Sequence, residues 1–484
     1  MSDSNREIDV DVAVIGAGTA GLVAFRQAAR HAERVVLIEG GAYGTTCARV
    51  GCMPSKLLIA AAEAAHSAEN AGRFGVHAAP VHIDGKAVME RVRRERDRFV
   101  GFVLDSVEKI PAEQRVRGMA RFEAPNVLAV EDGPRINAER IVIATGSRTN
   151  VVGFLKGAGS RLVTNDEVFE WTDLPESVAV FGPGVIGLEL GQALSRLGVR
   201  VRMFGVGGAV GPIRDPEIRK IALATFRDEF PLDPDASTTG VRETDAGVEI
   251  GFCDEHGTEV SETFDYLLAA TGRRPNVDGL ALENSGLALD DRGVPEFDPY
   301  TLRCGDSPIF IAGDANDELP ILHEAADEGR IAGANAGRYP AVQTGNRRVP
   351  MSVVFTDPQI AAVGLTIQQT DERCRGCFAV GSVNFENQGR SRVIGRNRGL
   401  LRVYGAHGTG RFMGAEMFGP AAEHIAHLLA WAAQQRMNVD ELLEMPFYHP
   451  VIEEGLRTAL RDLHDKLKLG PESADECMDC GPGT

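Results

Sequence analysis

The strongest constraint on the fold is a glycine pattern that occurs twice, each time between a short apolar strand pattern and a helix pattern. The copy VIGAGTAG contains Gly16, Gly18 and Gly21, and the copy VFGPGVIG contains Gly182, Gly184 and Gly187. Glycine at these positions allows a tight turn, close approach of the backbone to a pyrophosphate, and close packing of helix on strand. The positive end of the helix dipole then faces the phosphates. We therefore expect an α/β chain with two Rossmann-like nucleotide-binding domains.

The apolar pattern also predicts the elements around these copies and after them. We expect strands at 11–15, 34–38, 178–181, 199–204, 351–355 and 400–404, and helices at 21–31, 57–72, 85–109, 185–197, 421–435 and 451–466. Strands followed by helices in the last third predict a separate α+β unit.

An acidic residue is present at the first nucleotide site and missing from the second. Glu39 follows Gly16 by 23 positions and ends a strand, where a carboxylate can accept hydrogen bonds from ribose hydroxyls. The same step from Gly182 reaches Gly205, and no arginine cluster lies beside it. The residues alone therefore leave NAD and NADP open for the second site.

The amino-acid composition limits the kinds of partner that the protein can bind. The net charge of −18 repels phosphate, so we expect no nucleic-acid partner and no anionic membrane partner. The N-terminus lacks a secretory pattern, and no apolar stretch is long enough to cross a bilayer. We therefore expect a cytoplasmic protein, a compartment in which structural disulfides are rare.

Two cysteines lie five residues apart in TTCARVGCMPSK, at the start of a predicted helix. In an ideal α-helix the Cα atoms of such a pair lie roughly 8–9 Å apart, whereas a disulfide prefers roughly 5.5 Å. A bridge between Cys47 and Cys52 therefore requires a distorted first turn, and a strained, accessible disulfide is easily reduced. A structural disulfide and two unrelated buried thiols remain the alternatives.

CARVGCMPSK resembles the redox-active C-x4-C-x2-P-S-K segment of the class I pyridine nucleotide-disulfide oxidoreductases. Further segments match that family in order: IVIATGS, ATGRRPN, IFIAGDA, VFTDPQIAAVGLT and YHPVIEEGL. GVIGLELG, His449 and the chain length are most similar to the dihydrolipoamide dehydrogenase branch. Four positions depart from the family pattern: Thr45 stands for a glycine, Arg49 for an asparagine, Gly205 for an acid and Val451 for a threonine.

The resemblance implies a role for each motif. It implies that Cys47 exchanges with substrate, that Cys52 is the thiolate beside the flavin, and that Lys56 and Glu189 form an ion pair there. It also implies that His449 is the acid/base of thiol exchange, held by Glu454 and supplied by the other subunit of a homodimer. The implied FAD residues are Gly16, Gly18, Gly21, Glu39, Lys56, Thr145, Gly146, Asp314 and His323. The implied NAD(P) residues are Gly182, Gly184, Gly187, Gly272 and Arg273.

The domains implied by the resemblance are an FAD-binding domain with the redox disulfide (1–150), an NAD(P)-binding domain (151–275), a central domain that completes the FAD site (276–345), a dimerisation domain (346–470) and a flexible tail (471–484).

The implied activity is dihydrolipoamide:NAD⁺ oxidoreductase, with FAD as cofactor, NAD slightly favoured over NADP, and lipoamide or another disulfide as substrate. The alternatives are an NADPH-dependent reductase of another disulfide or a metal ion, and a redox-sensing flavoprotein with low turnover.

Two further C-x2-C pairs remain outside this scheme. Cys477 and Cys480 lie in the tail, where they could relay electrons or could be incidental, and Cys374 and Cys377 lie in a predicted turn. Both pairs together could bind zinc, but the two halves of a zinc site usually lie much closer in sequence than the 100 residues between them here. We therefore expect no metal site.

Overall fold

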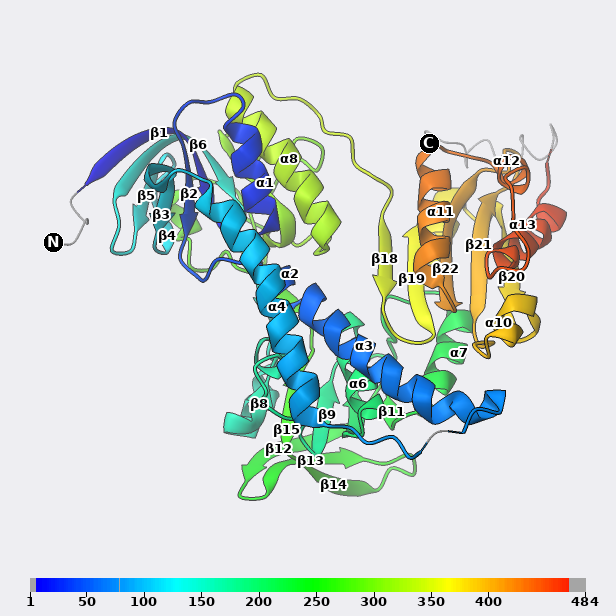
Figure 1. Ribbon diagram of the computed structural model, residues 1–484. Coiled ribbons are helices and arrows are strands. Elements are labelled where there is room, and N and C mark those ends of the chain that lie inside the picture. The colour runs from blue at the N-terminus through cyan, green and yellow to red at the C-terminus, as the bar shows by residue number, and fades with distance from the viewer. Residues whose placement is uncertain (1–5, 78, 470–484) are drawn as a thin grey trace.

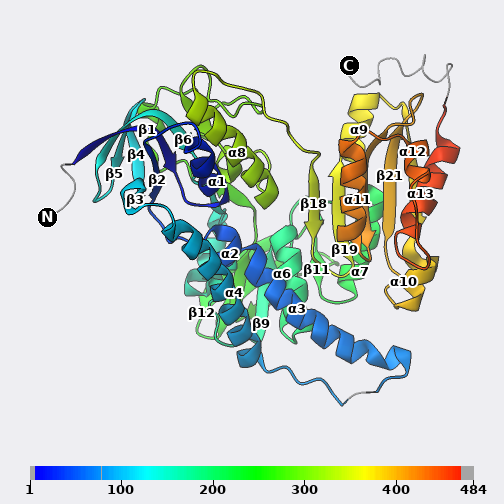
Figure 2. The same ribbon diagram turned by 45° about the horizontal axis from the view of Figure 1, so that its top comes forward.

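The computed structural model describes residues 6–77 and 79–469, which form three units grouped around two long helices (Figure 1). These helices are α3 (Cys52–Glu69) and α4 (Gly85–Glu108). Figure 2 shows that they run from the first unit along the second, and that α3 continues toward the third. Helix α3 begins at Cys52, five residues earlier than predicted, so the second cysteine lies in its first turn.

The first unit is built on a seven-stranded sheet in the order β3-β2-β1-β6-β5-β4, with β17 also paired to β6. Its elements are β1 (Glu7–Ile15), α1 (Thr19–Ala28), β2 (Val35–Glu39), α2 (Thr46–Val50), β3 (Arg115–Arg117), β4 (Ala120–Ala124), β5 (Val127–Val130), β6 (Arg135–Ile143), β17 (Ile309–Ile311) and α8 (Leu322–Arg338). Strands β1, β2, β3, β6 and β17 are parallel where they pair, as the first glycine pattern predicts.

The segment after residue 276 returns to this first sheet. Strand β17 pairs with the carboxyl half of β6, and α8 packs along α1. The two helices touch closely because α8 presents glycines to α1: a Cβ at Gly329 or Gly333 would collide with the backbone of Ala20 or Ala24. We therefore propose that 276–345 belongs to the first unit.

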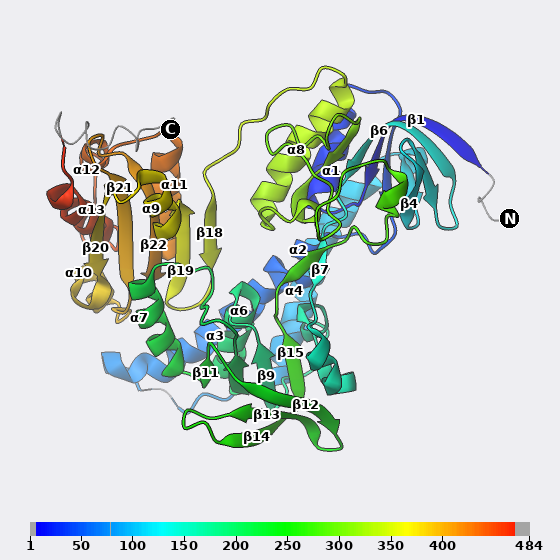
Figure 3. The ribbon, with the colours of Figure 1, turned by 180° about the vertical axis from the view of Figure 1, so that it is seen from behind.

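The second unit repeats the first at smaller size. Its parallel sheet has the order β11-β10-β9-β15-β8, beside an antiparallel β12-β13-β14 sheet. The elements are β8 (Leu162–Val163), α5 (Asn165–Val168), β9 (Ser177–Phe181), α6 (Val185–Arg196), β10 (Arg200–Phe204), α7 (Pro216–Arg227), β11 (Leu232–Asp233), β12 (Thr238–Thr244), β13 (Gly247–Cys253), β14 (Glu259–Phe264) and β15 (Tyr266–Ala269). Seen from behind, the β12–β14 sheet lies at the edge of this unit farthest from the first unit (Figure 3).

The third unit is an antiparallel sheet in the order β18-β19-β22-β21-β20 with helices packed on it. Its elements are β18 (Met351–Val354), β19 (Gln359–Gly364), α9 (Ile367–Cys374), β20 (Phe378–Asn384), α10 (Gly389–Val393), β21 (Leu400–Ala406), β22 (Phe412–Gly419), α11 (Ala422–Gln434), α12 (Val439–Leu443) and α13 (Glu454–Lys466). The α/β fold class with a C-terminal α+β unit is thus confirmed, although α13 begins three residues later than predicted.

Polar contacts fix the units to one another. The two-stranded sheet of β7 (Ser147–Thr149) and β16 (Arg273–Pro275) marks both crossings between the first and second units. Between the second and third units, the fully buried Asp215 accepts hydrogen bonds from Arg402 and Tyr404, at 3.0 and 3.2 Å. Burial, followed by the charges of Glu416 and Asp215, raises the pKa of Tyr404, which keeps the phenol protonated as a donor. Across residues 6–77 and 79–469, no helix combines the length and apolar character that a membrane crossing requires.

Candidate functional site

The cysteine pair lies at a break between two helices. Cys47 is in the short helix α2, Cys52 opens α3, and Gly51 between them has φ −124° and ψ −116°, which is not helical. A Cβ at Gly51 would lie 3.0 Å from the carbonyl oxygen of Thr46 and 3.2 Å from the Cα of Cys47. Glycine therefore lets the two helices meet closely enough to bring the thiols together. This break is the distortion that the five-residue spacing requires.

Thr45 keeps a backbone conformation that suits glycine. Its φ of 59° and ψ of 150° lie in a region that side chains rarely occupy. The Thr45 hydroxyl accepts a hydrogen bond from the N–H of Ala48 at 3.3 Å and so caps α2. The threonine in place of the family's glycine therefore preserves the turn, and a helix cap partly offsets the strain.

The thiols of Cys47 and Cys52 are in hydrogen-bond contact with each other. The thiol of Cys47 donates to Cys52, and this bond is the largest cause that lowers the pKa of Cys52 to about 7, followed by the charge of Lys56. The same bond, with burial, raises the pKa of Cys47. Cys52 is exposed and Cys47 is half-buried. The two thiols are thus unequal, and Cys52 is the one that ionises near neutral pH.

Lys56 lies one turn along α3 from Cys52 and forms an ion pair with Glu189 of α6, with Nζ 2.6 Å from Oε2. The other oxygen of Glu189 accepts the N–H of Phe355 at 2.9 Å, and the Lys56 ammonium lies 4.7 Å from the centre of the Phe355 ring. The Glu189 side chain is 4% exposed, so its charge needs both partners. One ion pair therefore joins the first unit, the second unit and the β18–β19 loop.

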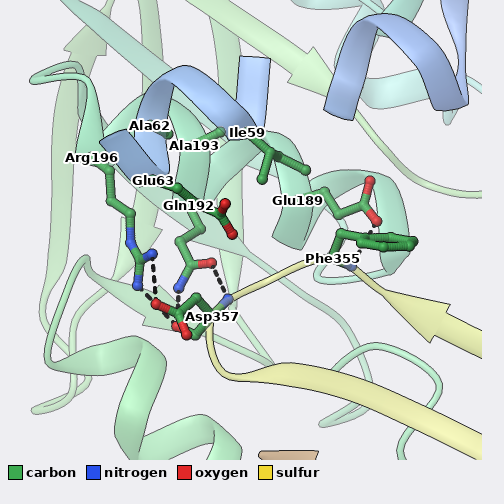
Figure 4. Close-up of a pocket in the computed structure, with 9 residues that line it drawn as sticks. All are labelled: Ile59, Ala62, Glu63, Glu189, Gln192, Ala193, Arg196, Phe355 and Asp357. Atoms are coloured by element: carbon green, nitrogen blue, oxygen red, sulfur yellow. Dashed lines mark hydrogen bonds and ion pairs between the residues drawn. The ribbon is translucent and has the colours of Figure 1, made fainter. Parts of the chain in front are cut away.

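A cavity of about 10 Å³ lies behind this ion pair, which is room for one water molecule (Figure 4). Its lining residues are Ile59, Ala62, Glu63, Glu189, Gln192, Ala193, Arg196, Phe355 and Asp357. Gln192 and Arg196 of α6 both bind Asp357, through the bonds drawn in Figure 4. Burial, the largest cause, raises the pKa of Glu63. This polar layer holds α6, and with it Glu189, against the β18–β19 loop.

The predicted acid/base pair is formed within the third unit. The Nδ1 atom of His449 lies 3.0 and 3.1 Å from the two carboxylate oxygens of Glu454, at the start of α13. This contact is the largest cause that lowers the pKa of Glu454, followed by the N–H of Val451. The side chain of His449 is 81% exposed. Figures 1 and 3 show α2 beyond the β18 edge of the third unit's sheet and α13 beside β20 at its other edge, so one chain does not bring this dyad to its own thiols.

In both patterns the outer two glycines are enclosed by backbone, whereas the middle glycine faces open space. A Cβ at Gly16 or Gly21 would collide with the backbone of Ala144 or Gly16, and Gly182 and Gly187 are enclosed in the same manner. A Cβ at Gly18 or Gly184 would meet nothing within 4 Å. The outer glycines therefore serve packing, and the middle one opens the space in front of the helix N-terminus for a ligand.

Polar groups surround the first of these spaces. The carboxylate of Glu39 accepts the N–H groups of Ala17 and Gly41 at 2.7 and 2.6 Å. Within the described chain, the hydroxyl of Thr145 and the Nε2 atom of His323 are buried and find no hydrogen-bond partner. Buried polar atoms are rarely left unpaired, and Thr145 lies against Gly16, so its hydroxyl indicates a ligand in this space. The Nε2 atom of His323, on α8, lies 3.9 Å from the carboxylate of Glu324.

The remaining predicted cofactor residues lie where the first and second units meet. Ser147 donates to Asp314 at 2.6 Å and accepts from Arg273 at 2.8 Å. Gly146 and Gly272 both have positive φ, and their carbonyls accept the N–H groups of Asn276 and Asn150 at 2.9 Å. Arg273 is thus occupied by Ser147 and supports the turn that carries Asp314.

At the second nucleotide space, Gly205 is required by its surroundings. A Cβ there would lie 2.6 Å from the carbonyl oxygen of Pro234 and 2.7 Å from Cγ of Pro183. An acid nevertheless reaches this turn from the next strand, because the carboxylate of Asp235 accepts the N–H of Gly207 at 2.7 Å.

Sequence reasoning did not single out Gly51, Phe355 or Glu328. Glu328 is buried, its pKa is raised to about 7 by burial, and it accepts the N–H of Gly313 at 2.7 Å, next to Asp314. An acid in a helix pattern rich in glycine and alanine was the available signal. Cys477 and Cys480 lie outside the described residues.

Comparison with known proteins decides the family. Residues 10–329 match the family model described as pyridine nucleotide-disulphide oxidoreductase, and residues 350–460 match the dimerisation domain of that family. The chain belongs to the pyridine nucleotide-disulphide oxidoreductases. Dihydrolipoyl dehydrogenase of Haloferax volcanii is 31% identical over 93% of this chain and 95% of its own. Dihydrolipoyl dehydrogenase 3 of Pseudomonas aeruginosa is 30% identical over 94% and 98%.

Solved structures agree on the fold. LpdA of Mycobacterium tuberculosis superposes with a TM-score of 0.79 at 26% identity, covering 93% of this chain and 99% of its own. The HOCl-induced flavoprotein disulfide reductase RclA of Escherichia coli gives a TM-score of 0.79 at 23% identity, covering 95% and 100%, which shows the fold alone.

This oxidoreductase is therefore an FAD-dependent flavoprotein that uses a pyridine nucleotide and a disulfide. The open space at Gly18, the carboxylate of Glu39 and the unpaired hydroxyl of Thr145 fit the FAD of such an enzyme.

The hydrogen bond from Cys47, followed by the charge of Lys56, sets a testable pH dependence at Cys52. With the pKa lowered to about 7, the thiolate exists above that pH and is lost as the pH falls through it. We expect the long-wavelength absorbance of a thiolate beside oxidised flavin, recorded in the two-electron-reduced enzyme, to titrate with a midpoint near that value. Lys56→Met should raise the midpoint by about 1 pH unit. Glu189→Gln should lower it, because the Glu189 charge opposes ionisation of Cys52. A midpoint that neither variant moves would contradict the assignment.

Proposed function

We propose that this flavoprotein is a dihydrolipoamide:NAD⁺ oxidoreductase that works as a homodimer. The observation that carries the proposal is the unequal thiol pair, with Cys52 poised to ionise beside Lys56 and Cys47 held as its donor. A pair of this kind suits exchange with a substrate that carries two thiols of its own. The curated dihydrolipoyl dehydrogenases that match nearly the whole chain support this choice of substrate.

In the oxidised enzyme, Cys47 and Cys52 form a disulfide. A thiolate of dihydrolipoamide attacks the sulfur of Cys47, and Cys52 leaves as a thiolate stabilised by Lys56. The second substrate thiol then attacks the mixed disulfide, which releases lipoamide and leaves Cys47 reduced. His449 of a second copy accepts the protons through Nε2, while Glu454 holds Nδ1 and fixes the tautomer. Bound FAD supplies the two-electron transfer from the dithiol to NAD⁺.

In this proposal each predicted site residue has a place. FAD is held by Gly16, Gly18, Gly21, Glu39, Lys56, Thr145, Gly146, Asp314 and His323. The nicotinamide nucleotide is held by Gly182, Gly184, Gly187 and Gly272, while Arg273 supports the junction of the two units through Ser147.

The turn after β10 supports NAD over NADP. Gly205 admits no acid of its own, but Asp235 places a carboxylate at the same turn. In this fold the ribose hydroxyls of the nucleotide lie at that strand end, so the charge of Asp235 repels a 2′-phosphate.

The homodimer follows from the exposed His449 and from the matched dimerisation domain. The third unit exposes large apolar side chains: Tyr448, next to His449, is 81% exposed, and Trp431 of α11 is 66% exposed. We propose that the surface around Tyr448 meets the first unit of a second copy and brings His449 to its Cys47.

Substrate comparison tests the activity. Holoenzyme is assayed with dihydrolipoamide and NAD⁺ or NADP⁺, and in reverse with NADH or NADPH against lipoamide, oxidised glutathione and oxidised thioredoxin. We expect kcat/KM to be highest for the dihydrolipoamide–NAD⁺ pair, and Cys47→Ser to abolish that activity while retaining FAD. A clear preference for NADPH with another disulfide would contradict the proposal.

Mixed dimers test the shared site. Cys47→Ser and His449→Gln chains, each with its own affinity tag, are co-expressed, and dimers that carry both tags are isolated. If His449 serves the partner's thiols, one site of each mixed dimer is intact, so about half of the wild-type activity returns. If each chain used its own histidine, every site would carry one lesion, and the mixed dimer would be no more active than its parents.

A further inference from the structure

The break between α2 and α3 leaves the backbone carbonyl of Val50 without a partner inside a helix. In a continuous helix this carbonyl would accept the N–H of the residue four positions on, which is Pro54. Proline has no N–H, so that bond cannot form. Val50 is buried, and a buried carbonyl that lacks its helical partner needs another donor. The segment that joins the two cysteines therefore requires a donor from elsewhere in the chain.

Asn165, at the start of α5 in the second unit, supplies this donor. Its side-chain amide donates to the carbonyl of Val50 at 2.7 Å and to the carboxylate of Asp166 at 2.9 Å. Its amide oxygen accepts the hydroxyl of Thr149 at 3.0 Å. Asn165 is 4% exposed, and the three bonds use both N–H groups and the oxygen of its amide. The amide is therefore fixed in orientation, and it ties α2 to the second unit.

The bond from Asn165 lies next to the residue that lets the two cysteines meet. Val50 ends α2 and precedes Gly51, whose non-helical backbone separates α2 from α3. Cys47 is on α2 and Cys52 is on α3, so the relative position of these helices sets the separation of the two sulfurs. The bond to Asn165 is thus placed to hold the helices in the position that a disulfide needs.

We propose, on the basis of the redox role proposed above for this pair, that Asn165 is a positioning residue that holds Cys47 and Cys52 together and so sets the reduction potential of their disulfide. In the oxidised enzyme the sulfur–sulfur bond itself holds α2 against α3. In the dithiol only non-covalent contacts do so, and loss of the Asn165 bond therefore frees the dithiol more than the disulfide. Two freer thiols have a lower effective concentration for closing the bond, so the dithiol becomes favoured.

The test is an anaerobic potentiometric titration of the flavin-loaded enzyme at about pH 6, with the state of Cys47 and Cys52 read by alkylation and mass spectrometry. At this pH Cys52, whose pKa is about 7, is mostly protonated, so reduction of the disulfide takes up two electrons and two protons and gives two thiols. Asn165→Ala should favour the dithiol about five- to tenfold, which raises the potential by about 20–30 mV.

Two further variants change the same contact in other ways. Asn165→Leu fills the space of the amide without a donor and leaves no room for a bridging water, so it should shift the potential at least as far as Asn165→Ala. Thr149→Val removes only the hydroxyl that orients the amide, and it should favour the dithiol about twofold. This variant also carries the test if replacement of Asn165 costs the enzyme its flavin.

The ionisation of Cys52 gives a second readout, because the hydrogen bond from Cys47 is the largest cause of its lowered pKa. When the Asn165 variants let the helices move apart, this bond weakens, and the thiolate absorbance of the two-electron-reduced enzyme should titrate about half a pH unit higher. The charges of Lys56 and Glu189 also act on Cys52 and are unchanged in these variants. A midpoint that stays at the wild-type value would contradict the positioning role.

Asn335 provides the matched control, because it is also fully buried and its amide also donates to backbone carbonyls. These carbonyls, of Thr301 and Gln343, lie outside the α2–α3 segment, so Asn335→Ala should lower thermal stability and leave the potential unchanged. A wild-type couple that no variant shifts, or an equal shift in Asn335→Ala, would overturn the positioning role of Asn165. Absence of any thiol–disulfide couple at positions 47 and 52 in the wild type would overturn the proposed function along with it.

Discussion

The ion pair between Lys56 and Glu189 is the contact on which the site depends. It connects the helix that carries Cys52 to the helix that follows the second glycine pattern, and the second oxygen of Glu189 ties both to Phe355 of the third unit. Removing Lys56 would leave the buried charge of Glu189 uncompensated; a fully buried pair loses about 3–5 kcal/mol in this way, and this pair loses less because Lys56 is 32% exposed. The polar layer of Gln192, Arg196 and Asp357 supports the same junction from behind.

This junction also determines which of the two cysteines ionises and which stays protonated. Lys56 lies one turn from Cys52, so its charge stabilises the thiolate there, and Cys47 in α2 remains the protonated donor. The break at Gly51 makes the inequality possible, because a continuous helix would hold the two sulfurs apart and on different faces. The backbone arrangement thus makes one of two similar thiols a thiolate near neutral pH and the other its hydrogen-bond donor.

Much of this arrangement could be predicted from the sequence because it follows from local rules. Glycine spacing gave the two nucleotide-binding units, and the five-residue spacing of Cys47 and Cys52 required a distorted helix start. What could not be predicted depends on contacts between distant segments. Phe355 reaches Glu189 only through packing of the third unit, and Asp235 reaches the turn at Gly205 from a neighbouring strand.

The most direct test of the central claim, that electrons pass between flavin and a sulfur–sulfur bond at positions 47 and 52, is an anaerobic reductive titration. The account predicts that each wild-type chain takes up about four electrons, two in the flavin and two in the disulfide, whereas Cys47→Ser takes up about two. A wild-type chain that accepts only two electrons, with no new thiol at Cys47 or Cys52, would contradict it.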